Sequence, residues 1–459
     1  MTDTITIRKG LDIPIAGAAE RRIVNALGIR TYAVKPTDFV GLTPRLMVEE
    51  GAIVASGDAL FCDKHDERIL FTSPVSGQVK AIVRGEKRRL EAVVVEARQE
   101  DSPAVYNIPQ NADEIKALML RSGLWTMLRQ RPFGVIANPD DKPKAIFVSA
   151  FDSAPLALDY DFILQGKEDF FKKGLEALSS FTTGQVHVCF RPDQGLVKHL
   201  SPHYVKGPHP AGNVGTQIAH IDPINKGEVV WTMNPQDVAV LGESVTTGVY
   251  RPEKVIAVAG PQIKNPHYYR IKAGACAAGI VAEQVLNPEY PKMESTENVK
   301  ENRIISGNIL SGTQITADGF IGAYDSLLSI LPEGNYYDFM GWLMPGLKKY
   351  SFSRTFLSGL LSPLTSHFPT YQFDTNTHGD VRPLVFTGNF ERVFPFNIYP
   401  TQLIKACIVG DIDLMEQLGI YEVEPEDLAL CEFIDVSKTE IQQIIRDALE
   451  TLRKEVADV

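Results

Sequence analysis

The residues best placed for chemistry lie in one loop in the middle of the chain, Gly207-Pro-His-Pro-Ala-Gly-Asn-Val-Gly-Thr216. Glycines permit positive φ or close backbone approach, and prolines fix φ, so the loop can hold backbone N–H groups toward a ligand or partner. The alternative, a tight connection between a strand and a helix, stays open, because the glycine spacing fits neither the dinucleotide nor the Walker motif. The candidate binding residues are Gly207, His209, Gly212, Asn213 and Gly215.

Asp152 is a further candidate, because it follows the clearest buried strand, 145–149. Open α/β sheets bind ligands at the carboxyl ends of their strands. The stretch 149–155 contains no glycine, so a pyrophosphate would meet side chains there instead of bare backbone. Capping of a turn or helix is the alternative role for Asp152.

Metal ligands and nucleophiles do not group into recognisable motifs. The cysteines are scattered without a Cys-x-x-Cys pair, which argues against a zinc ribbon or a self-contained iron–sulfur cluster. His199 and His203 have helical spacing, but Pro202 disfavours the helix that would bring both rings to one metal. The sequence contains no Gly-x-Ser-x-Gly, His-Glu-x-x-His or Walker motif. We therefore assign no catalytic residue and no metal ligand.

Length and charge narrow the class of protein. A chain of 459 residues is too long for one core and predicts about three or four domains. The net charge of −11 argues against a nucleic-acid partner, because no long Lys/Arg run offsets it. No apolar run approaches the roughly 20 residues that span a bilayer, and the start of the chain lacks a signal-peptide pattern. We expect a cytoplasmic protein or a peripheral component of a membrane complex.

The first ~100 residues predict an all-β unit, because short apolar runs alternate there with glycine-containing turns. This pattern resembles the barrel-sandwich fold of lipoyl and biotinyl carrier domains. Lys64 falls near the position of the modified lysine in such carriers. Its charged connection is longer than a tight carrier hairpin needs, so we expect an unmodified lysine, with lipoylation as the alternative.

Strands and helices alternate in the next region, which predicts a largely parallel sheet covered on both faces. A first helix is predicted after Asn111 as N-cap. The apolar runs and periodicities then predict strands at 145–149, 185–189, 229–232 and 254–258, and helices at 168–181, 214–221 and 235–247.

Short strands return from 260 to about 332, as a compact α+β unit. An aromatic-rich stretch from Tyr336 to Pro345 and a Pro/Thr/Ser-rich loop at 362–380 follow, and the aromatic residues either pack between domains or form a docking surface. The last ~60 residues predict an αα-hairpin of helices at 401–408 and 411–418. A capping box, Ser437-Lys-Thr-Glu440, predicts the start of a final helix.

Seven stretches, from residue 9 to residue 431, carry a resemblance to a known family. They are Lys9-Gly-Leu-Asp-Ile-Pro-Ile15, Leu46-Met-Val-Glu-Glu-Gly51, Ser122-Gly-Leu-Trp-Thr126 with Arg131-Pro-Phe133, Gly207-Pro-His-Pro-Ala-Gly-Asn-Val-Gly215, Ala259-Gly-Pro261, Arg392-Val-Phe-Pro395 and Glu426-Asp-Leu-Ala-Leu-Cys431. Together they resemble the NqrA family of subunits of the bacterial sodium-translocating NADH:quinone reductase, in the family's order and over nearly the whole chain. That family is similar to the C subunit of Rnf complexes and to the flavin subunit of complex I.

The resemblance implies a redox-complex subunit without a redox centre of its own. The relatives hold FMN phosphate in a glycine-rich loop, whereas this chain has Trp-Thr-Met-Leu-Arg-Gln-Arg after Leu124. Cysteine runs that ligate iron–sulfur clusters in the relatives are reduced here to Cys407 and Cys431. We therefore expect flavins and Fe–S centres on partner subunits, and ubiquinone as the one candidate ligand of this chain.

By the same resemblance, the complex has six subunits, oxidises NADH, reduces ubiquinone and exports Na⁺. This subunit would lie peripherally on the cytoplasmic face of the bacterial inner membrane. It would assemble the complex and contribute to a quinone pocket, without autonomous catalysis. The competing hypothesis is a stand-alone α/β enzyme or binding module that acts on a soluble metabolite.

The fold class expected from all of this is multidomain α/β and α+β. Its expected parts are a lipoyl-like barrel-sandwich β domain (1–103), a Rossmann-like α/β domain (104–259), a β-grasp-like, SLBB-type domain (260–332), an aromatic-rich insertion and loop (333–385), and a C-terminal helical domain (386–459).

Overall fold

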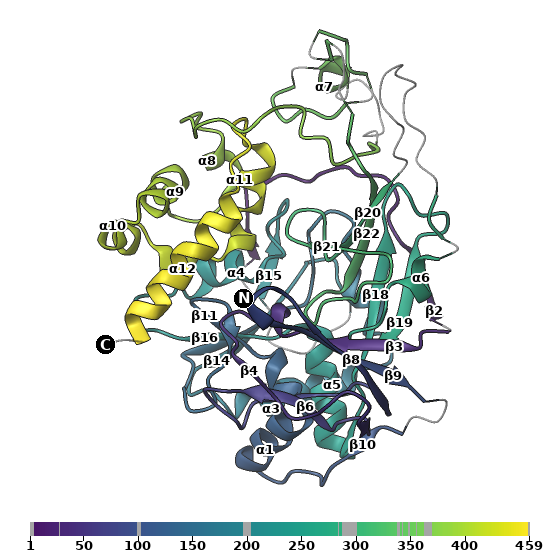
Figure 1. Ribbon diagram of the computed structural model, residues 1–459. Coiled ribbons are helices and arrows are strands. Elements are labelled where there is room, and N and C mark those ends of the chain that lie inside the picture. Colours follow the sequence, from purple (N-terminus) through teal and green to yellow (C-terminus); the bar gives the residue numbers. More distant parts are fainter. Residues whose placement is uncertain are drawn as a thin grey trace.

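A computed structural model describes residues 4–457 except 27, 99–101, 196–202, 283, 287–300, 337–339, 342, 348, 355 and 362–369. The chain is a mixed α/β protein of several parts, with a barrel-sandwich near the N-terminus and helices at the C-terminus (Figure 1). Within the described residues, no helix combines the length and the apolar character needed to cross a membrane.

The central α/β sheet has seven strands in the order β1-β15-β14-β13-β16-β11-β12. The first five pair in parallel, and β11 and β12 extend the sheet antiparallel at the edge beside β16. The strands are β1 (Thr4–Thr6), β11 (Arg129–Arg131), β12 (Val135–Ile136), β13 (Ala145–Ser149), β14 (Gln185–Phe190), β15 (His203–Lys206) and β16 (Val230–Thr232).

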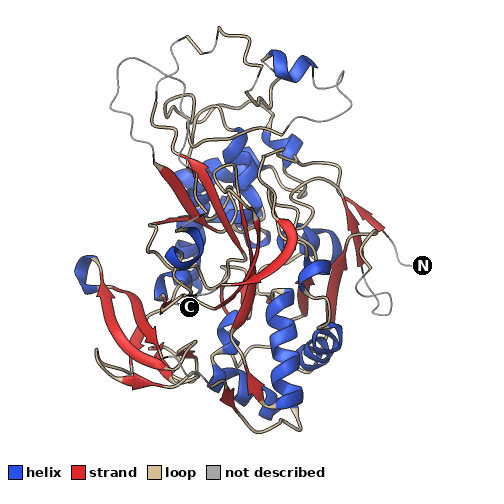
Figure 2. Ribbon diagram, turned by 90° about the vertical axis from the view of Figure 1, so that its right-hand side faces the viewer, coloured by secondary structure: helices blue, strands red, loops and turns tan. Residues whose placement is uncertain are grey.

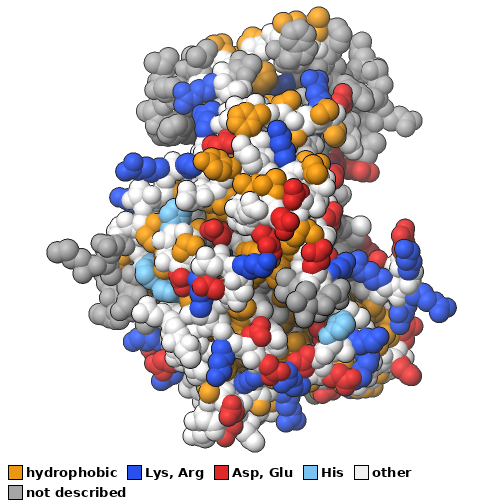
Figure 3. Space-filling model, turned by 90° about the vertical axis from the view of Figure 1, so that its left-hand side faces the viewer, with side chains coloured by type: hydrophobic (Ala, Val, Ile, Leu, Met, Phe, Trp, Pro, Cys, Tyr) orange, Lys and Arg blue, Asp and Glu red, His pale blue; other side chains and the backbone are white. Residues whose placement is uncertain are grey.

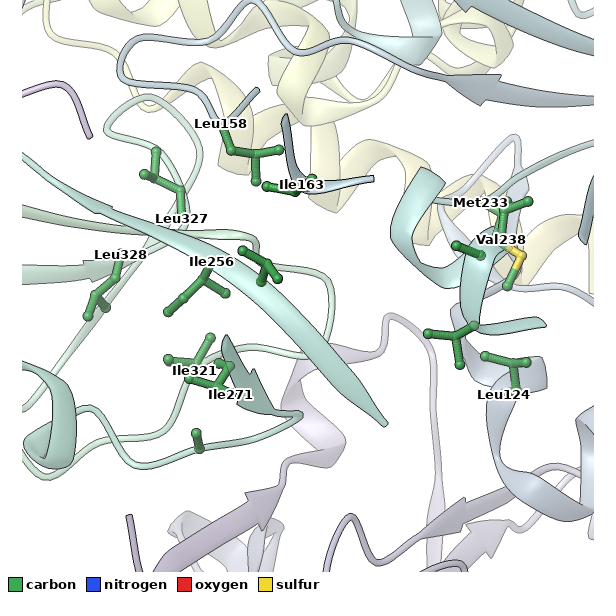
Figure 4. Packing of buried hydrophobic residues seen from close by; sticks show 14 of the residues in the cluster. Leu124, Leu158, Ile163, Met233, Val238, Ile256, Ile271, Ile321, Leu327 and Leu328 are labelled. Carbon is green, nitrogen blue, oxygen red and sulfur yellow. The ribbon is translucent and has the colours of Figure 1, made fainter. Parts of the chain in front are cut away.

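Helices cover both faces of this sheet, as the alternating pattern predicts. On β13, Ile146 and Val148 face the core with α3 and α5, whereas Ala145 and Phe147 face α4. In Figure 4, Met233, just before α5, and Val238, in its first turn, lie beside Leu124. The helices are α1 (Ala112–Ser122), α2 (Tyr160–Ile163), α3 (Glu168–Ser179), α4 (Val214–Ile221) and α5 (Pro235–Thr247).

The barrel-sandwich consists of two antiparallel sheets that pack face to face around a core with Phe61 stacked on Phe71. Lys64 is exposed in the connection from β6 to β7, where the Asp63 carboxylate accepts a hydrogen bond from the His65 amide. The first sheet contains β3 (Thr31–Val34), β5 (Ile53–Val54), β8 (Gly77–Arg84) and β9 (Leu90–Ala97), and the second β4 (Pro44–Leu46), β6 (Ala59–Asp63) and β7 (Leu70–Thr72).

A second large sheet is mixed and has the order β2-β19-β18-β22-β20-β21. The strand predicted at 254–258 belongs here as β18, so its assignment to the α/β sheet was wrong: it pairs with β19 and β22, which follow it in the chain. These strands are β2 (Glu20–Asn25), β18 (Glu253–Ala259), β19 (His267–Lys272), β20 (Asn302–Ser306), β21 (Thr313–Ile315) and β22 (Leu327–Pro332). Between them lies α6 (Ala278–Val281), and β10 (Ala104–Val105) pairs separately with β17 (Val249–Tyr250).

The N-terminal residues connect the parts of the molecule. β1 pairs with β15 in the α/β sheet, and β2 pairs with β19 in the mixed sheet, so both strands lie outside the barrel-sandwich. Between these strands, the Gly10 amide donates to the Arg392 carbonyl and the Leu11 amide to the His209 carbonyl.

The C-terminal part is helical, and Gly410 and Asp411 form the connection of the predicted αα-hairpin between α9 and α10. The final helix begins at Ile441, so the capping box was placed wrongly. Asp435 instead accepts from the amides of Ser437 and Thr439 in the turn before the helix, and Lys438 has a φ of 59°. The helices are α7 (Leu357–Leu361), α8 (Phe390–Val393), α9 (Pro400–Val409), α10 (Ile412–Gln417), α11 (Ala429–Ile434) and α12 (Ile441–Ala457).

The aromatic-rich stretch continues to Tyr350, where it packs internally, and the docking surface stays a prediction. The ring of Tyr350 lies against Tyr371, Phe373 and Phe433, which joins this stretch to the helical region. Its apolar residues Met340, Leu343, Met344 and Leu347 are about half exposed or more. Part of the stretch and of the following loop lies outside the described residues.

Candidate functional site

A cavity of about 210 Å³ lies at the carboxyl ends of β13 and β16. After β13 the chain adds β14 and β15 on one side of it and then β16 on the other. Open α/β sheets bind ligands in the crevice where the strand order reverses in this way. Ser149 ends β13, Thr232 ends β16, and both line the cavity.

Other parts of the molecule close this crevice. Loops of the mixed sheet contribute Leu310 and Tyr324, and the helical region contributes Glu426 and Ala429. Four of the six residues predicted from the sequence line the same cavity, and these are Asp152, His209, Gly212 and Asn213. The cavity is therefore a junction of three parts of the chain.

The loop at 207–216 needs its glycines mainly for close approach. A Cβ on Gly212 would lie 2.5 Å from the Ser153 amide nitrogen. A Cβ on Gly215 would lie 2.4 Å from both carboxylate oxygens of Asp427. Gly207 has a φ of +145°, and its Cβ would lie 2.3 Å from the Ile7 carbonyl oxygen. Gly207 and Gly215 thus serve packing, whereas Gly212 brings backbone to the cavity wall.

His209 is buried in the wall of the cavity. Its Nδ1 lies 3.0 Å from Ser153 Oγ, and the same hydroxyl accepts a hydrogen bond from the Gly212 amide at 2.7 Å. The His209 amide donates to Asp12 Oδ1. Burial lowers the pKa of His209 to about 4, so the ring is neutral at pH 7.

Asp152 caps a turn, because its Oδ1 accepts a hydrogen bond from the Ala154 amide at 2.8 Å. Burial, and secondarily the neighbouring Glu426 carboxylate, raise the pKa of Asp152. Asn213 lies between the cavity and the helical region, and its Nδ2 donates to the Glu426 carbonyl oxygen at 3.3 Å. The polar side chains Asp152 and Asn213 in the cavity wall are therefore held by hydrogen bonds to backbone groups.

The cavity also faces groups that favour electronegative atoms. Asn213 and Asn234 precede α4 and α5, so the amino ends of both helices point toward the cavity. Arg129 lies with its guanidinium carbon 5.2 Å from the centre of the Tyr324 ring. Its Nη2 pairs with Glu424, while its buried Nε has no hydrogen-bond partner among the described residues. The Arg129 side chain itself lines the cavity.

A buried ionic cluster lies behind the cavity, and we define it as Arg129, Arg131, Glu424, Glu426 and Asp427. Arg131 is 2% exposed and pairs with Asp427 at 2.9 Å, Glu426 at 2.9 Å and Glu424 at 3.2 Å. The Arg446 guanidinium donates to the Phe133 carbonyl beside it. The cluster joins β11 to the helical region across nearly 300 residues of sequence.

The sequence predicted the loop at 207–216 as a candidate site, but it did not predict most of the other residues that line the cavity or form the ionic cluster. Arg129, Tyr324 and Glu426 have no local motif, because they meet only through long-range packing. A signal did exist in the alternation of Arg129 and Arg131 along a short strand, with three carboxylates at 424–427. Chemically, the cavity offers hydrogen-bond donors and apolar walls without an activated nucleophile among its described residues.

His203 lies beside His187 in the structure, whereas the sequence analysis considered it together with His199. His203 Nε2 lies 2.9 Å from His187 Nδ1 on the adjacent strand, and His199 lies outside the described residues. Burial lowers the pKa of both rings. No cluster of three or more potential metal ligands occurs among residues that the structure describes.

Comparison with known proteins identifies the family. Residues 5–98 match the family described as "NqrA N-terminal barrel-sandwich hybrid domain", residues 110–250 "NqrA second alpha/beta domain" and residues 255–292 "NQRA C-terminal domain". Proteins named as the A-type subunit of the Na(+)-translocating NADH-quinone reductase from Yersinia pseudotuberculosis, Histophilus somni and Haemophilus influenzae are each 38% identical to this chain, over 98% of it and 100% of their own length. The chain therefore belongs to the NqrA family of Na(+)-translocating NADH-quinone reductase subunits.

Proposed function

We propose that this chain is a peripheral subunit, on the cytoplasmic face of the bacterial inner membrane, of a six-subunit complex that oxidises NADH, reduces ubiquinone and exports Na⁺. It assembles with the other subunits, which carry the flavins and Fe–S centres, and it has no autonomous catalysis. The observation that carries the proposal is the 38% identity over 98% of the chain to relatives that are named as this subunit.

We further propose that the cavity holds the ring of ubiquinone. Its volume of about 210 Å³ lies below the roughly 300 Å³ at which pockets for drug-sized ligands begin, and so suits a single ring better than a flavin nucleotide. Phe151, Met233 and Tyr324 supply apolar contact area. Arg129 and the amino ends of α4 and α5 supply positive potential for the carbonyl oxygens.

The loop contributes to this pocket by close approach. Gly212 keeps the backbone against Ser153, which holds His209 in the wall. Replacement of Gly212 by Val is expected to disrupt folding, because the new side chain would overlap the Ser153 amide. The side chains of His209 and Asn213 are the cleaner probes, because their truncation leaves the contact of Gly212 with Ser153 in place.

The test uses the assembled complex and a photoreactive ubiquinone. We expect label in residues of the cavity, displaced by unlabelled short-chain ubiquinone. His209→Ala and Asn213→Ala should reduce both labelling and quinone reductase activity, and Asn265→Ala, on an exposed loop, is the matched control. Label elsewhere, or unchanged activity and assembly in both variants, would refute the quinone pocket. Co-purification of the chain with membrane subunits tests membership of the complex separately.

A further inference from the structure

The longest hairpin of the barrel-sandwich ends in a group of cations. β8 and β9 pair along their whole length and project from the body of the molecule, with the turn at their end (lower left in Figure 2). We define the basic tip as Arg84, Lys87, Arg88 and Arg89. The projection on the right of Figure 3 shows Lys and Arg side chains gathered at this edge.

The charge of the tip contrasts with that of the rest of the chain. With Glu86 and Glu91, residues 84–91 carry a net charge of +2, whereas the remaining residues carry −13, which gives the total of −11. An anionic surface would repel most of the molecule and attract this hairpin. The tip would therefore decide which way the molecule faces such a surface.

The turn of the tip is held by backbone hydrogen bonds and by Arg84, and the side chains of Lys87, Arg88 and Arg89 take no part in it among the described residues. The turn is closed by its own backbone, since the Gly85 amide donates to the Arg89 carbonyl and the Arg89 amide donates to the Glu86 carbonyl. Lys87, Arg88 and Arg89 are exposed, and no ion pair among the described residues involves them. Their charge is thus available to a partner.

Two residues of the turn have a left-handed backbone conformation. Lys87 and Arg88 have φ angles of 52° and 61°, a left-handed conformation that is uncommon for side-chain-bearing residues. Arg84 donates to the Arg88 carbonyl oxygen at 3.1 Å and so lies along the turn. Val83, next to it, is 40% exposed and adds an apolar contact at the base of the tip.

We propose that the basic tip attaches this subunit to an anionic bilayer surface. The cations spread from a convex, projecting turn, which fits a broad layer of phosphate groups better than a fixed set of carboxylates in a protein pocket. Clustered Lys and Arg with an adjacent apolar side chain are the elements of peripheral lipid attachment. A membrane is present in the family's setting, because Na⁺ translocation requires one. The attachment is a property of the chain alone and does not depend on the quinone pocket.

The test is co-sedimentation of the full chain with vesicles of anionic phosphatidylglycerol or neutral phosphatidylcholine. We expect binding to the anionic vesicles, weakened by salt, and roughly thirtyfold weaker binding after Lys87→Gln with Arg88→Gln. Lys172→Gln with Lys173→Gln, an exposed pair on α3, removes the same charge elsewhere and should bind like the unsubstituted chain.

Several results would overturn the attachment. They are no binding by the unsubstituted chain, equal binding to neutral vesicles, and equal loss in the α3 variant. Capture by polyglutamate in preference to anionic vesicles would instead indicate an acidic protein partner. Unchanged thermal unfolding of the tip variant confirms that a loss of binding is not a loss of folding.

Discussion

Arginines occupy two regions of this molecule in opposite ways. In the ionic cluster, Arg131 is 2% exposed and faces three carboxylates within 3.2 Å. In the basic tip, Arg88 and Arg89 are exposed and have no ion-pair partner among the described residues. A buried charge must be matched where it lies, whereas an exposed charge is free for another molecule. The same side chain is therefore structural in one place and available in the other.

The cluster should respond most strongly to a change. Arg131→Met leaves Glu424 and Asp427 buried without their main counter-charge, and we expect a loss of about 3–5 kcal/mol in the free energy of unfolding. Denaturant unfolding measures it. Arg45→Met, in the exposed pair with Glu67, is the control and should leave the midpoint unchanged.

A double variant sharpens this comparison. Arg131→Met combined with Asp427→Leu removes both members of one pair, so it should lose less stability than the sum of the two single variants. Additive losses would show that the cluster does not act as a unit.

His209 is a buried titratable group without a counter-charge, so its effect on stability should depend on pH. Its pKa falls from 6.5 to about 4 on folding, so its contribution is complete above pH 6.5 and is lost as the pH falls toward 4, because the unfolded chain takes up the proton first. Between pH 7 and pH 4.5 this costs about 2.5 kcal/mol. Urea unfolding at both pH values should show this extra loss in the unsubstituted chain but not in His209→Gln. Equal losses would contradict a neutral, buried His209.

A substitution at Gly215 measures how closely the chain packs against the ionic cluster. Gly215→Ala places a methyl group 2.4 Å from the Asp427 oxygens and 2.5 Å from Arg131 Nη1, and we expect about 1–3 kcal/mol of destabilisation. Gly195, which has open space around its Cβ position, gives the matched control as Gly195→Ala. A thermal midpoint equal to that of the control would mean that the pair can move aside.

The tip should be the least sensitive region. Lys87→Gln with Arg88→Gln removes two exposed charges that form no ion pair among the described residues, so the free energy of unfolding should change by less than about 0.5 kcal/mol. Denaturant unfolding at low and high salt measures this. A larger loss would show that the tip serves folding, as the cluster does.

Local chemistry made some elements predictable from the sequence. α4 has the predicted bounds, and α5 runs from 235 to 247 because Asn234 accepts from the Gln236 amide and Pro235 occupies the first turn. Asn111 caps α1 in the same way, by accepting from the Glu114 amide. In each case the decisive residues lie within one turn of the boundary.

Other features depend on residues far apart in the chain. β18 has the same apolar pattern as the strands of the α/β sheet, and only its partners β19 and β22 assign it to the mixed sheet. α12 begins at Ile441, after a turn in which Asp435 accepts from the amides of Ser437 and Thr439. The cavity needed Tyr324 and Glu426 to be brought beside a loop more than a hundred residues earlier, which periodicity cannot show.

The pairing of the first strands has a consequence for synthesis on the ribosome. β1 pairs with β15, which is made about 200 residues later, and β2 pairs with β19. The strands of the barrel-sandwich, in contrast, pair with one another within residues 31–97, although β3 also bonds later to Gly274 and Cys276. The nascent chain can therefore form both sheets of the barrel-sandwich first, while β1 and β2 are still unpaired. The α/β sheet closes afterwards, and the contact of Gly10 with Arg392 forms only when most of the chain has emerged. The strands β1 and β2, which are synthesised first, are thus among the last to pair.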